Sequence, residues 1–279
     1  AKADTLPTLK GIDFDEKDAF IIESNATNDT IRYWIKDSLM CEKDTITIQL
    51  DYLYTDTLGN LVPKRDTLSL MNKLNREKRL ALAKEAMEKK EKEMKKKRRK
   101  GDTTNIVETK FFNMQVDAPS SMDINKNITL KFDEPVLSID TTAIHIEQKV
   151  DTLWQPGKFI LMKDSIIPRQ YYIISNWQPG NEYKLTIDST AIKNIYGLHT
   201  NKTENTIKIK TLEEYGTLYL NIKGAGENSI VQLLNSNDGV VREQKVKDNG
   251  TCDFYFLQAN TKYYIRMFID KNNNGKWDT

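Results

Sequence analysis

Cysteine and histidine are scarce in this sequence, and their scarcity argues against several kinds of site. The 279 residues include two cysteines, Cys41 and Cys252, and two histidines, His145 and His199. A disulfide framework or a cysteine-based zinc site needs clustered thiols. Neither histidine stands near a sequence signature of a nucleophile or a metal site. We therefore expect two free thiols in separate domains, and we expect that the protein is not an enzyme.

Long apolar runs are also missing. The apolar runs are only a few residues long, whereas a membrane-spanning helix needs roughly 20 apolar residues. With 38% hydrophobic residues and a mean hydropathy of −0.62, the composition predicts a soluble chain of two or three domains. The sequence opens on AKADTLPTLKG, with neither an initiator methionine nor a signal sequence, which we interpret as a processed product or an excised fragment.

One segment, residues 71–101, is strongly basic. Between Lys73 and Lys100, 14 Lys and Arg against five Glu give a net charge of +9, while the whole chain is +2, so the remainder is −7. The segment has no proline and no internal glycine, which favours a helix. Glutamate and lysine four residues apart stabilise such a helix, and the sequence offers the pairs Glu85/Lys89, Glu88/Lys92, Glu91/Lys95 and Glu93/Lys97.

The two halves of this predicted helix differ. The first half is expected to dock on a neighbour through an apolar set that comprises Leu74, Leu80, Leu82, Ala83, Ala86 and Met87. The second half ends in consecutive cations that repel one another and favour an anionic partner. We predict that this interaction surface comprises Lys95, Lys96, Lys97, Arg98, Arg99 and Lys100. The alternative is a charged connector between domains, and we expect a protein or lipid partner, not nucleic acid.

Residues 1–70 alternate short apolar and polar runs, which is typical of β-strands separated by turns. The four predicted strands span residues 19–23, 30–35, 45–54 and 61–70. The third has an apolar residue at every second position, namely Ile46, Ile48, Leu50 and Tyr52. Leu58-Gly59-Asn60 predicts the turn that joins the last two strands. We expect one small sheet within a β domain that is incomplete if the chain is cut at its start.

Residues 108–213 predict further strands at the spacing of an all-β sandwich. They span residues 108–114, 128–132, 144–149, 158–162, 171–174, 184–187 and 206–211. The segments DINKNITLKFDEPV (123–136), PGNEYKLTID (179–188) and AIKNIYGLHTNKTENTIKIKT (191–211) resemble the bacterial Ig-like domain of S-layer and envelope proteins. In that family the first segment runs into a Phe-x-Glu-Pro-Val turn, here Phe132 to Val136. The resemblance implies a structural module.

One part of the Ig-like pattern departs from the family. Where the family usually has Asp-x-x-Gly-Asn in its last loop, this chain has KNIYGL, from Lys193 to Leu198. A metal or turn role of that Asp is therefore not carried over to this sequence.

Residues 214–279 predict five more strands, over residues 217–222, 230–234, 240–246, 251–256 and 262–269. The order GTLYLNIKG, a short hairpin, then FLQANTKYYIRMFID resembles the prealbumin-like domains of carboxypeptidase regulatory regions and surface proteins. We therefore predict a mainly β protein, with tandem Ig-like and prealbumin-like β-sandwich domains and one long charged helix between the first and second domains. The predicted divisions are 1–70, 71–101, 108–213 and 214–279, the last of them cut at its end.

This succession of domains resembles Gram-negative envelope lipoproteins. The resemblance implies a place in the cell envelope, at the outer membrane or cell surface, and a lipid anchor outside this fragment. We predict a non-catalytic structural and interaction protein that docks on another envelope component, such as an outer-membrane protein complex. A carbohydrate-binding module is the alternative, and an enzyme comes third because no spacing selects an acid and base pair.

Residues 270–278, DKNNNGKWD, match the first nine positions of a calcium loop. Oxygen ligands at alternate positions would surround one hard cation, and Gly275 would permit the sharp bend. The predicted calcium ligands are Asp270, Asn272, Asn274, the Lys276 carbonyl and Asp278. The bidentate acid that completes such a loop would lie past Thr279. The alternative is a metal-free hairpin turn held by asparagine side chains.

Aspartate followed by Ser or Thr, and then by Thr or an aliphatic residue, recurs along the chain and resembles the acceptor motif of bacterial envelope O-glycosylation. The alternative is that these aspartates cap turns before strands. The eleven aspartates are Asp4, Asp29, Asp37, Asp44, Asp56, Asp66, Asp102, Asp140, Asp151, Asp164 and Asp188.

Aromatic residues provide the basis for the carbohydrate alternative. Exposed rings beside Asn and Asp can stack on saccharides, although such rings more often cover cross-strand neighbours in small sandwiches. The single tryptophans considered for this role are Trp154, Trp177 and Trp277.

Overall fold

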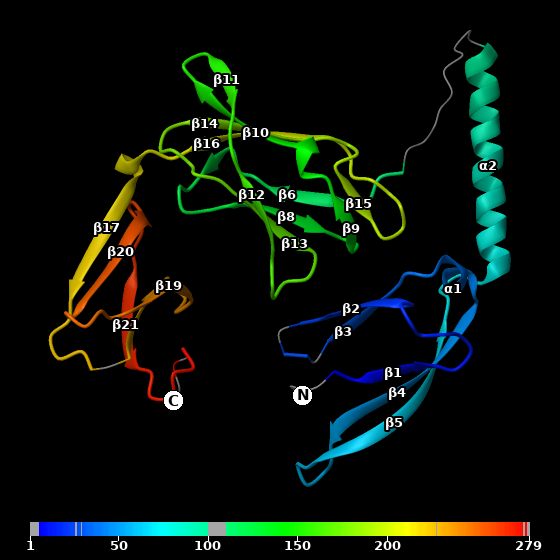
Figure 1. Ribbon diagram of the computed structural model, residues 1–279, viewed down its shortest axis with the longest axis horizontal. Helices are drawn as coiled ribbons and strands as arrows, with labels where there is room; N and C mark the ends of the chain where they lie inside the picture. The colour runs from blue at the N-terminus through cyan, green and yellow to red at the C-terminus, as the bar shows by residue number, and fades with distance from the viewer. Residues whose placement is uncertain are drawn as a thin grey trace.

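The computed structural model describes residues 6–25, 27–28, 30–99, 110–226, 228–275 and 277. The protein is mainly β, with three β units in chain order: the N-terminal unit (residues 6–71), the middle unit (110–211) and the C-terminal unit (212–277). Figure 1 shows the N-terminal and C-terminal units on opposite sides of the middle unit, and helix α2 projecting from the N-terminal unit. The predicted class of tandem β-sandwiches is confirmed. No helix among the described residues is long and apolar enough to span a membrane.

The N-terminal unit consists of two antiparallel layers and a short helix. One sheet has the order β1-β4-β5, and β2 and β3 form a separate hairpin. The prediction of a single four-stranded sheet is therefore wrong, because β2 and β3 pair only with each other among the described strands. Its elements are β1 (Thr8–Gly11), β2 (Phe20–Ser24), β3 (Ile31–Ile35), α1 (Ser38–Glu42), β4 (Thr45–Thr55) and β5 (Leu61–Met71).

Periodicity along β4 explains the core of this unit. Ile46 and Ile48 are buried, while Leu50 and Tyr52 on the same face are half-buried. Ala19 and Met40 complete the buried core, with partly buried side chains from the β2–β3 hairpin packed against it. The core is small because the hairpin covers only part of the three-stranded sheet.

The turn between β4 and β5 forms where the sequence predicts it. The Asp56 carboxylate accepts hydrogen bonds from the backbone amides of Leu58 (2.9 Å) and Asn60 (2.8 Å). Gly59 has φ of +85°, a conformation that glycine adopts without steric cost.

The middle unit is a β-sandwich with the largest core of the chain. One sheet has the order β11-β10-β14-β16-β7, the other has the order β12-β13-β8-β6, and β15 and β9 pair beside them. Alternate residues on the facing strands are fully buried, including Leu130, Ile173, Leu185 and Ile207. The strands are β6 (Met114–Asp117), β7 (Ser121–Met122), β8 (Ile128–Phe132), β9 (Val136–Ile139), β10 (Ile144–Val150), β11 (Leu153–Pro156), β12 (Ile160–Lys163), β13 (Gln170–Ile174), β14 (Glu182–Ile187), β15 (Ile192–Asn194) and β16 (Thr203–Ile209).

The chain enters this unit differently from the prediction of a strand over residues 108–114. Residues 108 and 109 lie outside the described residues, and the strand begins at Met114. Before it, Phe112 is buried in the core, and its amide donates to the His199 carbonyl (3.0 Å). Just before Met114, the chain is therefore held by the buried Phe112 side chain where a strand was predicted.

The loop that departs from the Ig-like family pattern is closed by Asn194. This side chain is fully buried, donates to the Glu134 carboxylate, and accepts from the amides of Tyr196 (3.0 Å) and Leu198 (2.8 Å). Asn194 therefore stabilises the turn that Gly197, with φ of +82°, completes. Its hydrogen bond to Glu134 also joins this loop to the Phe132–Val136 turn.

The C-terminal unit contains the five predicted strands, arranged in two layers. The antiparallel pair of β17 and β20 packs against a sheet with the order β19-β18-β21. Val231, Leu233, Cys252 and Phe254 form the centre of its core. The strands are β17 (Tyr215–Asn221), β18 (Ser229–Leu234), β19 (Val240–Lys245), β20 (Thr251–Gln258) and β21 (Tyr264–Ile269).

Both thiols are free, as predicted, and they lie in separate units. Cys252 is fully buried and Cys41 is half-buried. Burial raises the pKa of each thiol, and the nearby Asp37 raises that of Cys41 further. A raised pKa lowers the thiolate fraction at neutral pH, so both thiols are poor nucleophiles.

Candidate functional site

Helix α2 (Arg76–Arg99) begins at a polar clamp on the N-terminal unit. The Arg79 guanidinium donates to the carbonyls of Cys41 (2.8 Å) and Glu42 (2.7 Å) and to the Asp44 carboxylate (2.9 Å). The same Asp44 carboxylate accepts from the Arg76 amide (2.8 Å). Charge-assisted hydrogen bonds of this kind are among the strongest that proteins use. The clamp therefore fixes the position and direction of the helix at its first turn.

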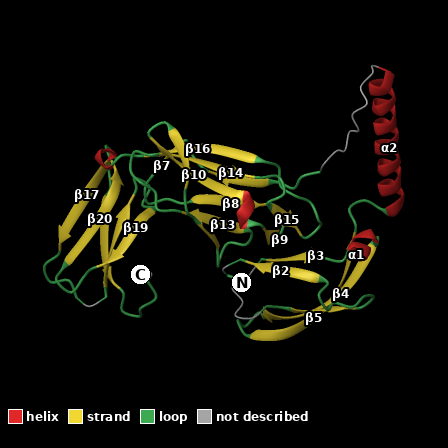
Figure 2. Cartoon of the chain, turned by 45° about the horizontal axis from the view of Figure 1, so that its top comes forward, coloured by secondary structure: helices red, strands yellow, loops and turns green. Residues whose placement is uncertain are grey.

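The start of the helix is also capped. The Asn75 side chain accepts from the Lys78 amide (3.0 Å), which satisfies one of the free donors of the first turn. From this cap the 24 residues of α2 extend for about 36 Å at 1.5 Å per residue. Figure 2 shows the helix standing away from the three β units along this length.

The predicted docking of the first half of α2 is wrong. Its bulky apolar side chains are exposed instead: Leu80 is 61% exposed, Leu82 53% and Met87 74%. Ala83 and Ala86 are exposed too, and Leu74, just before the helix, is 39% exposed. The reason is the clamp, because polar contacts of Arg79 hold the first turn and direct the helix axis away from the body. The apolar side chains of α2 are left available for contact.

The charges of α2 are mostly not used by the β units. Two of the predicted pairs form, Lys89 with Glu85 (2.8 Å) and Lys95 with Glu91 (2.6 Å), and both are internal to the helix. Among the described residues, the ion pair that joins α2 to a β unit is the one of Arg79. Within the predicted cationic surface, Lys95 and Lys96 are exposed. The side chains of Lys97, Arg98 and Arg99, and all of Lys100, lie outside the described part, so their role stays a prediction.

A largely buried ion pair joins the N-terminal unit to the middle unit. Glu23, on β2, accepts hydrogen bonds from the Trp34 indole (2.8 Å) and from Nε of Arg169 (2.9 Å). The Arg169 guanidinium also donates to the carbonyls of Phe132 (3.0 Å) and Asp133 (2.7 Å) and lies 5.2 Å from the Trp34 ring centroid. The side chains of Glu23 and Arg169 are only 12% and 20% exposed. This cluster, which we name the Glu23 junction, fixes the N-terminal unit on the middle unit.

A second cluster joins the middle unit to the C-terminal unit. Oδ1 of Asp123 lies 2.9 Å from Nζ of Lys210 and accepts from the Tyr215 hydroxyl (3.2 Å) and the Gln258 amide (2.9 Å). Tyr215 in turn accepts from the Ile124 amide (3.0 Å). We name this cluster the Asp123 junction. Burial by itself raises the pKa of Asp123, but the hydrogen bonds and charge of Lys210 and the bond from Gln258 leave the pKa below its ordinary value.

The predicted calcium loop is closed by its own backbone. Asp270 is buried, and its carboxylate accepts from the amides of Asn274 (3.1 Å) and Gly275 (2.8 Å). Asn272 accepts from the same Asn274 amide (3.2 Å). Lys276 and Asp278 lie outside the described residues. These contacts match the metal-free turn, and because carboxylate and amide oxygens can exchange such bonds for a cation, calcium stays a prediction.

The tryptophans do not form a shared platform for a saccharide. Trp177 is 5% exposed and packs edge-on against Tyr183, so its predicted role in sugar binding is wrong. Trp154 is half-buried with the ammonium groups of Lys149 and Lys184 near its ring, and Trp277 is 51% exposed under the Arg266 guanidinium. The cations near Trp154 and Trp277 compete with any sugar for their ring faces.

Several Asp-Ser and Asp-Thr motifs form turns. The carboxylates of Asp37, Asp56, Asp140 and Asp164 each accept from the amide two residues further on, at 2.8–2.9 Å. At Asp164 the amides of Ile167 and Ile166 and the Tyr172 hydroxyl lower the pKa to about 2. The capping explanation therefore holds at these four sites, and glycosylation stays a prediction.

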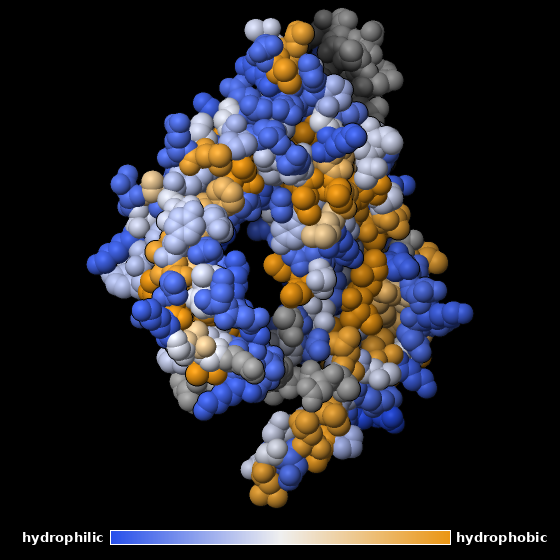
Figure 3. Space-filling model, turned by 60° about the vertical axis from the view of Figure 1, so that its left-hand side comes forward, coloured by the Kyte–Doolittle hydropathy of each residue, from blue (hydrophilic) through white to orange (hydrophobic). Residues whose placement is uncertain are grey.

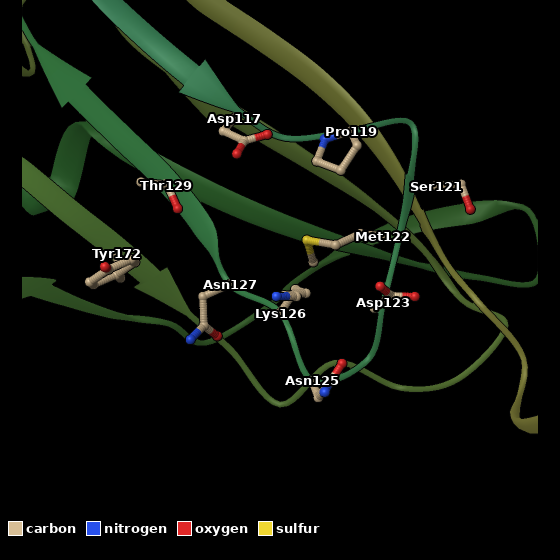
Figure 4. A pocket seen from close by; sticks show the side chains of 10 residues that line it. All are labelled: Asp117, Pro119, Ser121, Met122, Asp123, Asn125, Lys126, Asn127, Thr129 and Tyr172. Atoms are coloured by element: carbon tan, nitrogen blue, oxygen red, sulfur yellow. The ribbon is translucent and has the colours of Figure 1, made fainter. Parts of the chain in front are cut away.

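One pocket on the described surface lies beside the Asp123 junction. Figure 4 shows this pocket of about 460 Å³, lined by the loop between β6 and β8 and by Tyr172 of β13. Asp117 and Asp123 both contribute to its lining, but Asp123 is already bonded to three donors of the Asp123 junction. A carboxylate held in this way is a poor general base. On the face shown in Figure 3, apolar residues form separate patches among polar ones.

Comparisons with known proteins give weak similarities. No protein-family model and no curated protein matches the chain. Three solved structures are the N-terminal part of the bacterial S-layer protein SbsC (12% identity, TM-score 0.30, covering 58% of this chain and 42% of that one), the TIE protein of Bacillus anthracis (11%, 0.17, 94% and 45%) and the BSP domain of a biofilm-associated protein (11%, 0.21, 98% and 55%). The chain thus spans about half the length of each. TM-scores this low carry no argument about function, and the resemblance to envelope lipoproteins stays a prediction.

Proposed function

We propose that this chain is a non-catalytic component of a bacterial cell envelope whose β units hold helix α2 out as a contact surface for another envelope protein. The proposed location is the cell surface or outer membrane, and the proposed partner belongs to an outer-membrane protein complex. The segments of the middle unit that resemble envelope Ig-like domains support this location.

The observation that carries the proposal is that the first turn of α2 is held on the N-terminal unit while the helix beyond it is exposed. Arg79 makes three polar contacts that hold the first turn, one of them its ion pair with Asp44. Beyond it, Leu80 and Met87 are exposed on a segment of net charge +9, in a chain whose remainder is −7. A connector between domains gains nothing from exposed leucines, whereas a binding helix needs them.

The two junctions support the proposal by holding the β units together. The Glu23 junction joins the N-terminal and middle units directly, so α2 is not needed as a spacer between them. The Asp123 junction does the same for the middle and C-terminal units. A helix that projects from a body already joined without it is suited to contact something else.

The test compares a charge-neutral helix with a matched control. One variant replaces the cationic surface with glutamine at Lys95, Lys96, Lys97, Arg98, Arg99 and Lys100. The control replaces exposed lysines of the β units with glutamine at Lys126, Lys131, Lys158, Lys163, Lys208 and Lys223. Each is expressed in the native envelope, and companions are quantified at low salt, where exposed charges are least screened.

The two variants are expected to differ only in their companions. Both should fold, because the replaced side chains are exposed or lie at the free end of α2. The helix variant should lose its envelope companion and the control should keep it. Equal companions in the two variants would leave α2 as a structural connector and would refute the proposal.

A further inference from the structure

Three of the exposed apolar residues of α2 lie in a narrow line along one side of the helix. Leu80, Ala83 and Met87 follow the three- and four-residue spacing of a coiled-coil seam. The sequence has Met94 one heptad after Met87, with Lys90 at the position between them. At about 100° per residue these positions fall within roughly 60° of the helix circumference. Leu80 and Met87 are 61% and 74% exposed, so the line is uncovered. We call Leu80, Ala83 and Met87 the seam.

Cations flank the seam. Arg76, Lys84 and Lys95 each lie within about 60° of a seam residue around the helix, and all three are exposed. Two acids lie within the same angle of a seam residue, Glu77 and Glu91. Glu91 and Lys95 form an ion pair at 2.6 Å, so their charges offset each other. A partner on this side of the helix therefore meets apolar side chains beside the cations Arg76 and Lys84 and one acid, Glu77, within a segment of net charge +9.

From this arrangement we propose that the seam binds an acidic helical segment of a partner protein. The inference rests on the proposed function and names its partner class. A helix presenting Leu or Ile towards the seam and Glu towards Arg76 and Lys84 would satisfy both features at once. A second copy of α2 is disfavoured, because the segment carries a net charge of +9 in each copy.

A lipid surface fits the seam less well. Helices that lie in a bilayer interface need a wide apolar face with the charges on the other side. The seam covers only about 60° of the circumference, and Leu82, the other bulky apolar residue of this part of α2, lies about 160° from Leu80. Leu82 is 53% exposed, so it provides a matched control on the far side of the same helix.

The experiment measures binding of defined probes to the full chain. The acidic probe is a synthetic heptad-repeat peptide with Leu at positions a and d and Glu at e and g, and the basic probe has Lys in place of Glu. The third probe is a vesicle of phosphatidylglycerol and phosphatidylcholine. The variants are Leu80→Ser with Met87→Ser, and Leu82→Ser as the control.

The acidic peptide should bind, and the basic peptide should not. The double seam variant should raise the Kd for the acidic peptide about tenfold or more, as removal of central apolar contacts does, while Leu82→Ser leaves it unchanged. Equal losses in the two variants, or binding to the vesicle without binding to the acidic peptide, would overturn the inference.

The outcomes also separate the inference from the proposed function. If the acidic peptide does not bind and the charge-neutral helix still loses its envelope companion, the partner class is wrong while the contact role stands. If the charge-neutral helix keeps its companion, both are wrong.

Discussion

Replacement of Glu23 by alanine should release the N-terminal unit from the middle unit. The change removes the acceptor shared by Trp34 and Arg169, whose donors lie 2.8 and 2.9 Å from the Glu23 carboxylate. Loss of one partner from a fully buried ion pair costs about 3–5 kcal/mol. Here Arg169 keeps two carbonyl acceptors, so the lower figure of about 2–3 kcal/mol applies to closure of the junction.

Hydrogen exchange measures this release directly. A loss of about 2–3 kcal/mol corresponds to a roughly 30- to 150-fold faster opening-dependent exchange, since 1.4 kcal/mol is a factor of ten. The increase should appear in β2, in β3 and in the Pro168–Gln170 turn of the middle unit. Glu182→Ala is the control, because its pair with Lys149 is 37–39% exposed and lies within the middle unit. Exchange of β2 within threefold of the parent protein would refute the assignment of the Glu23 junction.

Three further predictions concern the other contacts. Asp123→Asn should weaken the Asp123 junction and make the stability of the protein less sensitive to acid. The pKa of Asp123 is lowered in the folded protein. The stabilisation by its carboxylate is therefore full above the unfolded pKa of about 3.9 and is lost as the pH falls through the lower folded value. Acid unfolding curves of parent and variant that stay parallel throughout this range would contradict this. Arg79→Ala should free the first turn of α2 and speed amide exchange of residues 76–80, without lowering the melting temperature of the middle unit. Added calcium should raise the melting temperature if Asp270, Asn272 and Asn274 bind it; an equal rise in Asp270→Ala, or no rise at all, would rule out the calcium site.

Strand positions could be predicted from the sequence wherever one face of a strand is buried. In β4 the alternation that ends in buried Ile46 and Ile48 is visible without the structure, because side chains point to opposite faces in turn. The five strands of the C-terminal unit were found for the same reason. Short elements such as α1, with five residues held by the Asp37 cap, have too few residues to show a period.

Sheet pairing and docking could not be predicted in this way. The four N-terminal strands have similar patterns, and nothing in them indicates that β2 and β3 leave the sheet of β4. The apolar content of α2 indicated a docked helix, yet the outcome depended on Arg79, whose acceptors are carbonyls and a carboxylate 35–38 residues away. A hydrophobic pattern shows which residues can be buried. In α2 those residues stay exposed, because the polar contacts of Arg79 direct the helix away from the β units.

The junctions are the functional feature that sequence reasoning missed. Glu23 and Arg169 are 146 residues apart, and Asp123 and Gln258 are 135 apart. Each is an ordinary charged or polar residue within a strand or turn, so no local spacing distinguishes it. The charge balance of the sequence indicates only that the basic segment is exceptional. It does not indicate which residues hold that segment on the N-terminal unit.

The most direct test of the central claim places a photo-crosslinking amino acid at position 84 of α2, beside the seam, in the native envelope. The matched control places it at position 158, an exposed lysine of the middle unit. One dominant crosslinked protein is expected from position 84, lost when Leu80 and Met87 are replaced by serine, and none is expected from position 158. Crosslinks from position 84 that survive those replacements, or a partner captured only from position 158, would contradict a contact role of α2.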